Sequence, residues 1–220
     1  VQLEQKKIID SYLDDISKYA STSEKPKAKN CYLSIPKQLA KENKKFMFSV
    51  VEKGVAARKY SNSLEWLRDA NLVRFCFNVS IPEFPLVAYE KDNQYKLYLN
   101  DIGILVSMYG YEMKSAIISN TLTGKEKCGI YENLIADMFV KKGYKLNYFK
   151  NKQNSQEIEF LLTKKGKIVP VEVKAGNGST KSLHEILKRN DIETGYKLTS
   201  GNIGIVDKKI TLPLYMGMFL

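Results

Sequence analysis

The sequence of 220 residues predicts a mixed fold of class α+β or α/β, with a helical first half and a mixed sheet in the second half. Two observations favour this fold. Apolar side chains recur at helical spacing before residue 71, and short strand patterns alternate with helices after residue 126. With 44% hydrophobic and 27% charged residues, the composition is that of a globular protein, which excludes collagen-like and wholly disordered chains.

The first half is expected to be a series of helices followed by two strands. Helices are predicted over residues 2–19, 28–33, 36–43, 56–71 and 101–109, and strands over residues 72–79 and 94–99. A new helix is expected at Pro36 because proline is tolerated in the first turn of a helix and not in its interior. The two strands are separated by a turn marked by Pro82 and Pro85.

Helices followed by a strand pair give the order of a winged helix, so residues 1–110 are assigned to a winged-helix-like module. The helix over 56–71 occupies the place of a recognition helix and carries Arg58, Lys59 and Arg68. Basic side chains that contact only the phosphates of DNA do not distinguish one base sequence from another. DNA binding therefore stays open for this module, and we favour rigid packing between domains.

The pattern changes after an irregular segment at residues 110–127, and residues 111–220 are assigned to a second domain. Helices are expected over residues 126–142 and 180–190, and strands over residues 145–149, 157–163, 168–173, 196–199, 203–206 and 210–213. This order predicts an α/β sheet with helices packed on it.

The chain is basic, with 35 Lys and Arg against 24 Asp and Glu and a net charge of +11. A basic surface favours phosphate backbones or acidic partners, although a lysine-rich surface that serves only solubility explains the charge equally well. The excess is larger in the second half, and DNA is the partner we expect there.

Location follows from cysteine usage and hydropathy. Cys31, Cys76 and Cys128 are far apart and odd in number, which is typical of buried thiols in a reducing cytoplasm. No stretch approaches the roughly 20 apolar residues of a membrane-spanning helix, and the start has no secretion signal pattern. Because the sequence starts at Val1 within a helical pattern, we expect it to be a piece of a longer protein.

Charged residues inside apolar strands are the candidates for chemistry. In the segment KIVPVEVK, Glu172 and Lys174 share one face of the strand, while the valines share the other. By the same alternation Glu157 and Glu159 share a face of the preceding strand. If the strands pair around the Lys-Lys-Gly turn, the acids and Lys174 converge.

Glu132 lies at the margin of the apolar arc on the helix over 126–142, where it can reach a sheet beneath. Carboxylates around a small pocket suit Mg²⁺, which would activate a water and neutralise charge at a scissile phosphate. Lys174 would orient that water or stabilise developing negative charge. The alternative is that these residues form solvated ion pairs without a catalytic role.

The residues GIYENLIADMFVKKGYKLNYFKN and EIEFLLTKKGKIVPVEVKAG resemble the PD-(D/E)xK, restriction-endonuclease-like domain. Together with SYLDDISKY, SIPKQLAKENKKFMFSVVEKGVAARKYSNSLEWLRDANLV, PLVAYEKDNQYKLYLNDIGIL and GNIGIVDKKITLPLYMGMFL, they resemble more closely the C-terminal region of a family of prokaryotic AAA-type ATPases. In that family an ATP-binding domain precedes the winged helix and the restriction-endonuclease-like α/β mixed-sheet domain. No GxxxxGK[ST] phosphate loop occurs here, so that ATPase domain is absent from the sequence and is an expected partner.

The resemblance places the helix acid on Glu132, the strand acid on Glu159 and the E-x-K pair on Glu172 and Lys174, with Glu159 and Glu172 as Mg²⁺ ligands. The strand acid is Glu where Asp is usual. Two functions follow. The first is a metal-dependent endonuclease acting on DNA phosphodiesters, and the second is a non-catalytic DNA- or protein-binding module that regulates the ATPase domain.

Overall fold

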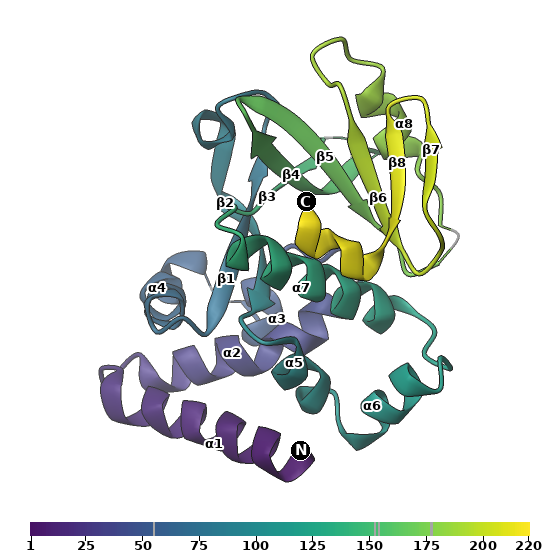
Figure 1. Ribbon diagram of the computed structural model, residues 1–220. Coiled ribbons are helices and arrows are strands. Elements are labelled where there is room, and N and C mark those ends of the chain that lie inside the picture. Colours follow the sequence, from purple (N-terminus) through teal and green to yellow (C-terminus); the bar gives the residue numbers. More distant parts are fainter. Residues whose placement is uncertain (55, 152, 154, 177) are drawn as a thin grey trace. The chain divides into compact units, whose positions relative to one another are not determined.

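The chain divides into two compact units in a computed structural model that describes residues 1–54, 56–151, 153, 155–176 and 178–220 (Figure 1). The first unit, here called the helical unit, comprises Val1–Phe75 and Leu97–Ile130. The second, here called the sheet unit, comprises Cys76–Lys96 and Tyr131–Leu220. The chain therefore crosses between the units three times.

The helical unit is built from helices. They are α1 (Gln2–Tyr19), α2 (Lys25–Leu39), α3 (Phe48–Val51), the 3₁₀ turn η1 (Ala57–Lys59), α4 (Ser61–Asp69), α5 (Ile102–Met108) and α6 (Tyr111–Ile118). Of these, α1, α2, α4 and α5 contain buried apolar residues. Tyr32 of α2, Leu64 and Leu67 of α4, and Leu105 of α5 are almost completely buried. Burial of these side chains, rather than helix propensity, provides most of the stability of such helices.

Two local predictions in this unit were wrong. The break expected at Pro36 is absent, because α2 runs through it. Proline removes one backbone hydrogen bond, but Ile35, Pro36 and Leu39 are all buried, and this packing outweighs the loss. The segment expected to be irregular contains α6, which starts after Gly110, a residue with a φ of 105°.

Eight strands form one sheet in the order β2-β1-β3-β4-β5-β6-β8-β7. Their bounds are β1 (Val73–Val79), β2 (Glu90–Leu99), β3 (Asn147–Lys150), β4 (Glu157–Lys164), β5 (Lys167–Val173), β6 (Gly195–Thr199), β7 (Gly204–Val206) and β8 (Lys209–Pro213). The 3₁₀ turn η2 (Leu86–Tyr89) precedes β2, and η3 (Leu214–Phe219) follows β8. The sheet is mixed, since β1 pairs with β3 in parallel, β3 and β5 pair with β4 antiparallel, and β6 pairs in parallel with β5 and β8.

The hairpin β4–β5 confirms the predicted Lys-Lys-Gly turn. Lys164 pairs with Lys167, so Lys165 and Gly166 form a two-residue loop, and both have positive φ angles of 50° and 76°. Positive φ at both central residues is the geometry of the hairpin turn that matches the twist of the strands. The turn fixes the register of the two strands that carry the candidate acids.

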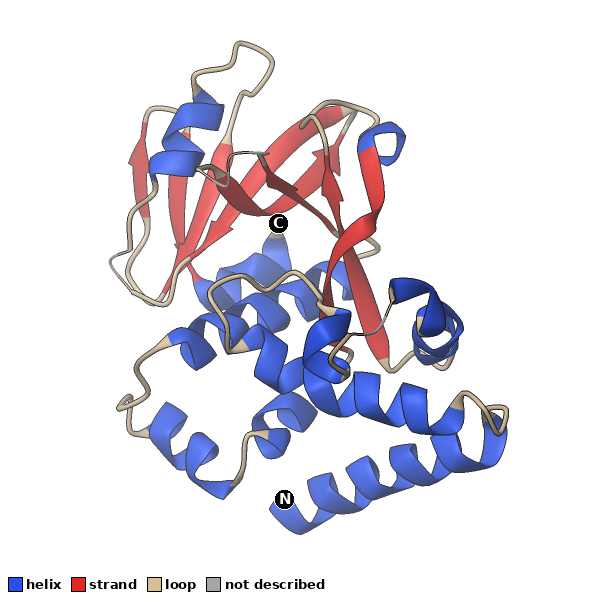
Figure 2. Ribbon diagram, turned by 180° about the vertical axis from the view of Figure 1, so that it is seen from behind, coloured by secondary structure: helices blue, strands red, loops and turns tan. Residues whose placement is uncertain are grey.

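Two helices cover opposite faces of the central strands. In α7 (Lys125–Lys141), Phe139 contacts Phe160 of β4 edge to face, with ring centroids 5.5 Å apart. The helix α8 (Lys181–Leu187) packs on the sheet (Figure 2). Its Leu183 and Leu187 lie close to Gly195 beside Pro170 of β5. Because Phe160 is paired with Val171, the neighbour of Pro170, the two helices lie on opposite faces.

The expected fold class is confirmed, since a helical N-terminal region is followed by a mixed sheet. The two strands expected after the helices are present as β1 and β2, and they belong to that sheet, in which β1 pairs with β3. The assignment of residues 1–110 and 111–220 to two domain types stays a prediction.

Candidate functional site

The strands β4 and β5 bring Glu159, Glu172 and Lys174 together, as the alternation of side chains predicts. The Lys174 ammonium lies 2.9 Å from Glu159 Oε1 and 2.8 Å from Glu172 Oε1. Both carboxylates are buried, whereas the Lys174 side chain is 22% exposed. We call these three residues the Lys174 group. In this group, the partly exposed ammonium of Lys174 lies between two buried carboxylates.

A β-bulge in β4 sets the position of Glu159. Asn147 pairs with Leu161 and Phe149 with Ile158, so Tyr148 alone is opposite both Glu159 and Phe160. A bulge places two successive residues against one and re-aims their side chains, and bulges are frequent beside active sites. The Glu159 carboxylate also accepts a long hydrogen bond of 3.4 Å from the Val173 amide.

Electrostatics in the Lys174 group depart from those of exposed residues. Burial raises the pKa of Glu159 to about 7, with further increases from the Glu132 and Glu172 carboxylates and an opposing effect of Lys174. Burial would lower the pKa of Lys174, but the two acids reverse this effect and raise it. Lys174 therefore stays charged at neutral pH, and the neighbouring carboxyl group of Glu159 has a raised pKa.

A second group lies next to the first, and we call it the Lys96 group: Lys96, Glu132, Glu157 and Lys150. The Lys96 ammonium is 3.3 Å from Glu132 Oε2 and 2.8 Å from Glu157 Oε1. Lys150 lies 2.8 Å from Glu157 Oε2. Burial alone would raise the pKa of Glu157, but the two lysines lower it to about 2. Glu132 thus contacts Lys96, and its charge raises the pKa of Glu159.

Lys96 was missed as a site residue from the sequence, although a signal for it exists. It occurs within the strand segment QYKLYL, between apolar or aromatic residues, just as Glu172 occurs within IVPVEV. Its side chain is 1% exposed, and its ammonium lies 4.9 Å from the centre of the Tyr148 ring. A charged side chain inside an apolar strand therefore marks both groups.

The residues of the Lys174 group fit Mg²⁺. Glu172 Oε2 is buried and accepts no hydrogen bond from the part of the chain that the structure describes, so one oxygen is available as a ligand. Mg²⁺ is bound in proteins by one or two carboxylates together with waters and substrate phosphates. No arrangement of three or more His, Cys, Asp or Glu side chains able to hold a metal ion is found in the described residues. The two carboxylates beside Lys174, Glu159 and Glu172, are the residues that would hold such an ion.

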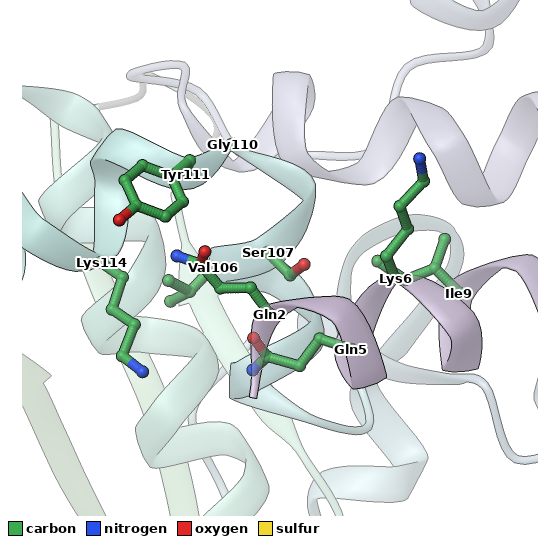
Figure 3. A pocket seen from close by; sticks show the side chains of 9 residues that line it. All are labelled: Gln2, Gln5, Lys6, Ile9, Val106, Ser107, Gly110, Tyr111 and Lys114. Carbon is green, nitrogen blue, oxygen red and sulfur yellow. The ribbon is translucent and has the colours of Figure 1, made fainter.

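Two cavities lie away from these groups. One of about 220 Å³ in the helical unit is lined by α1 and by residues of α5 and α6, and Figure 3 shows the ends of Lys6 and Lys114 lying apart from each other. The other, of about 370 Å³, lies beside α8 and the β7–β8 hairpin and includes His184 and Asp207. His184 is exposed on α8.

Comparison with family models covers most of the chain. Residues 2–115, just over half of the chain, match the model described as Domain of unknown function (DUF8612). The chain belongs to this family. Residues 127–215 match the model described as Domain of unknown function (DUF4143), a domain commonly found at the C-terminus of AAA-type ATPases. The expected link to a C-terminal ATPase region is supported at this level. No match is found among curated proteins or among solved structures.

Two further expectations from the sequence concern the burial of the cysteines and the hydropathy of the helices. Cys31 and Cys76 are buried, as predicted, and Cys128 is half-buried. Within the described residues, no helix combines the length and apolar character needed to cross a membrane.

Proposed function

We propose that the sheet unit is a Mg²⁺-dependent nuclease-like domain that acts on DNA phosphodiesters and accompanies an AAA-type ATPase domain. The observation that carries the proposal is the placement of Lys174 between Glu159 and Glu172 with Glu172 Oε2 left without a hydrogen bond. A structural ion pair would be expected to satisfy every buried oxygen. The raised pKa of Glu159 further supports a functional site.

The chain's residues would divide the work as follows. Glu159 and Glu172 hold the metal, and Lys174 orients the attacking water or stabilises the negative charge that develops on the phosphate. When bound, Mg²⁺ would lower the pKa of a coordinated water and neutralise charge on the phosphodiester. The net charge of +11 supports attraction of the chain to a nucleic acid backbone.

The test is a plasmid-nicking assay on the purified chain with Mg²⁺ or Mn²⁺. We expect Lys174→Ala to reduce nicking by about 100-fold or more while the metal binds at least as tightly, because the ammonium competes for the same oxygens. Glu172→Gln should abolish both metal binding and nicking. The matched control is Lys167→Ala, which removes an exposed lysine from β5, the strand that Lys174 follows.

The outcomes separate the two functions. Equal nicking by the parent and Lys174→Ala would assign the activity to a contaminant and overturn the proposal. Salt-sensitive DNA binding without metal-dependent nicking would instead favour the non-catalytic module. Glu159→Asp tests the longer strand acid, and faster nicking by this variant would show that the extra methylene limits the reaction.

A further inference from the structure

The two lysine groups of the sheet unit share one design. In each, an ammonium lies between two carboxylates from different elements: Lys174 with Glu159 and Glu172, and Lys96 with Glu132 of α7 and Glu157 of β4. A divalent cation bound between carboxylates would occupy the same kind of place. The question is which ammonium an incoming ion can replace.

The groups differ in access and in satisfaction of their oxygens. Lys174 is 22% exposed and leaves Glu172 Oε2 without a hydrogen bond. Lys96 is 1% exposed, is packed against the Tyr148 ring, and shares Glu157 with Lys150, which binds its second oxygen. An ion can therefore approach the Lys174 group, whereas Glu132 Oε2 and both oxygens of Glu157 are engaged by lysine ammonium groups.

The charges lead to the same conclusion. The two groups together comprise four carboxylates, Glu132, Glu157, Glu159 and Glu172, and three lysines, Lys96, Lys150 and Lys174. Binding of one divalent ion changes the net charge of the two groups from slightly negative to slightly positive, which favours an incoming phosphodiester. A second ion would add a further two positive charges in a buried, low-dielectric place, which is costly.

We propose that Lys96 is a positioning residue that stands where a second divalent cation would bind, so that the site takes a single metal ion at Glu159 and Glu172. This inference rests on the proposed function and adds that the chemistry uses one metal ion rather than two. Lys96 acts through Glu132 and Glu157, which it holds as its own partners and keeps from serving as metal ligands. Two-metal sites hold their ions about 4 Å apart, and Lys96 removes the acids needed for the second.

The test is titration of the full chain with Mn²⁺, followed by calorimetry and by electron paramagnetic resonance of the bound ion. We expect the parent to bind about one Mn²⁺ and Lys96→Met to bind about two, with a spin-coupled spectrum in the variant, because Mn²⁺ accepts the same oxygen ligands as Mg²⁺. Lys145→Met removes an exposed lysine paired with Glu90, and its stoichiometry should equal that of the parent.

A further variant separates a metal site from general damage to the fold. In Lys96→Met combined with Glu132→Gln and Glu157→Gln, the freed carboxylates are absent, so binding should return to about one ion. If Lys96→Met is unfolded without metal, Mn²⁺ should restore its near-ultraviolet circular dichroism, because the ion replaces the lost charge.

The outcomes bear on two claims, the role of Lys96 and the proposed metal-dependent function. One ion in both the parent and Lys96→Met, two ions in the parent, or a variant that stays unfolded in millimolar Mn²⁺ would each overturn the role of Lys96. Absence of binding to the parent would overturn the proposed metal-dependent function itself.

Discussion

The helical unit and the sheet unit bury polar side chains of different kinds. Among the described residues, the buried polar side chains of the helical unit are the neutral Gln38 and Ser63, whereas those of the sheet unit include Lys96, Glu132, Glu159 and Glu172. Gln38 accepts a 2.6 Å hydrogen bond from the Met47 amide and donates to Ser34, which fixes a loop locally. Buried charges cost far more than buried amides, so the sheet unit contains the side chains that are most costly to bury.

The largest expected effect on stability is in the sheet unit. Lys96→Met leaves Glu132 and Glu157 without their shared cation, and removal of one partner from a buried ion pair costs about 3 to 5 kcal/mol. Urea unfolding in the presence of a chelator, with hydrogen exchange of β3, β4 and β5, measures this loss. Lys145→Met, which removes an exposed partner of Glu90, should cost less than about 1 kcal/mol. Equal losses in the two variants would contradict the high cost assigned to a buried charge in the sheet unit.

An intermediate effect is expected from packing in the helical unit. A Cβ atom on Gly129 would lie 2.5 Å from the backbone oxygen of Leu39, which cannot move without shifting α2. Gly129→Ala should therefore destabilise this unit by about 2 kcal/mol. Trp66, the single tryptophan, is half-buried in α4 and reports unfolding of the helical unit by fluorescence.

The control for this packing prediction is Gly204→Ala, because a Cβ there meets no atom within 4 Å. It should change stability by less than about 0.5 kcal/mol. A neutral Gly129→Ala variant would show that α7 and α2 adjust to each other more freely than their close backbone approach indicates.

The smallest effect concerns an acid of the helical unit and depends on pH. Hydrogen bonds from Lys27 and Ser63 lower the pKa of Glu24 below its ordinary value of 4.5. An acid with a lowered pKa stabilises the fold above its ordinary pKa, and this contribution disappears as pH falls through the folded pKa. Glu24→Gln should therefore cost about 1 kcal/mol at pH 7 and progressively less below pH 4.5.

Trp66 fluorescence during urea unfolding at neutral and acidic pH measures the Glu24 effect. Glu4→Gln, which removes an exposed acid paired with Lys7, should show little change at either pH. If the loss of stability in Glu24→Gln does not vary with pH, the contribution of Glu24 comes from the shape of its side chain and not from its charge.

Local sequence patterns determined much of the sheet unit. Strand alternation placed Glu172 beside Lys174, the Lys-Lys-Gly turn predicted the β4–β5 hairpin, and helical spacing located α7 within one residue at each end. These features follow from the periods of strand and helix and from the φ angles that a turn requires, all of which act over a few residues.

Tertiary structure decided the rest, because the missing information lies in contacts between distant segments. Pro36 stays within α2 because its neighbours are buried, although local propensity predicts a break. The bulge that orients Glu159 arises where β3 pairs with β4. Lys96 joins Glu132 and Glu157 only because β2, α7 and β4 meet in one core, where a cation is retained when carboxylates surround it.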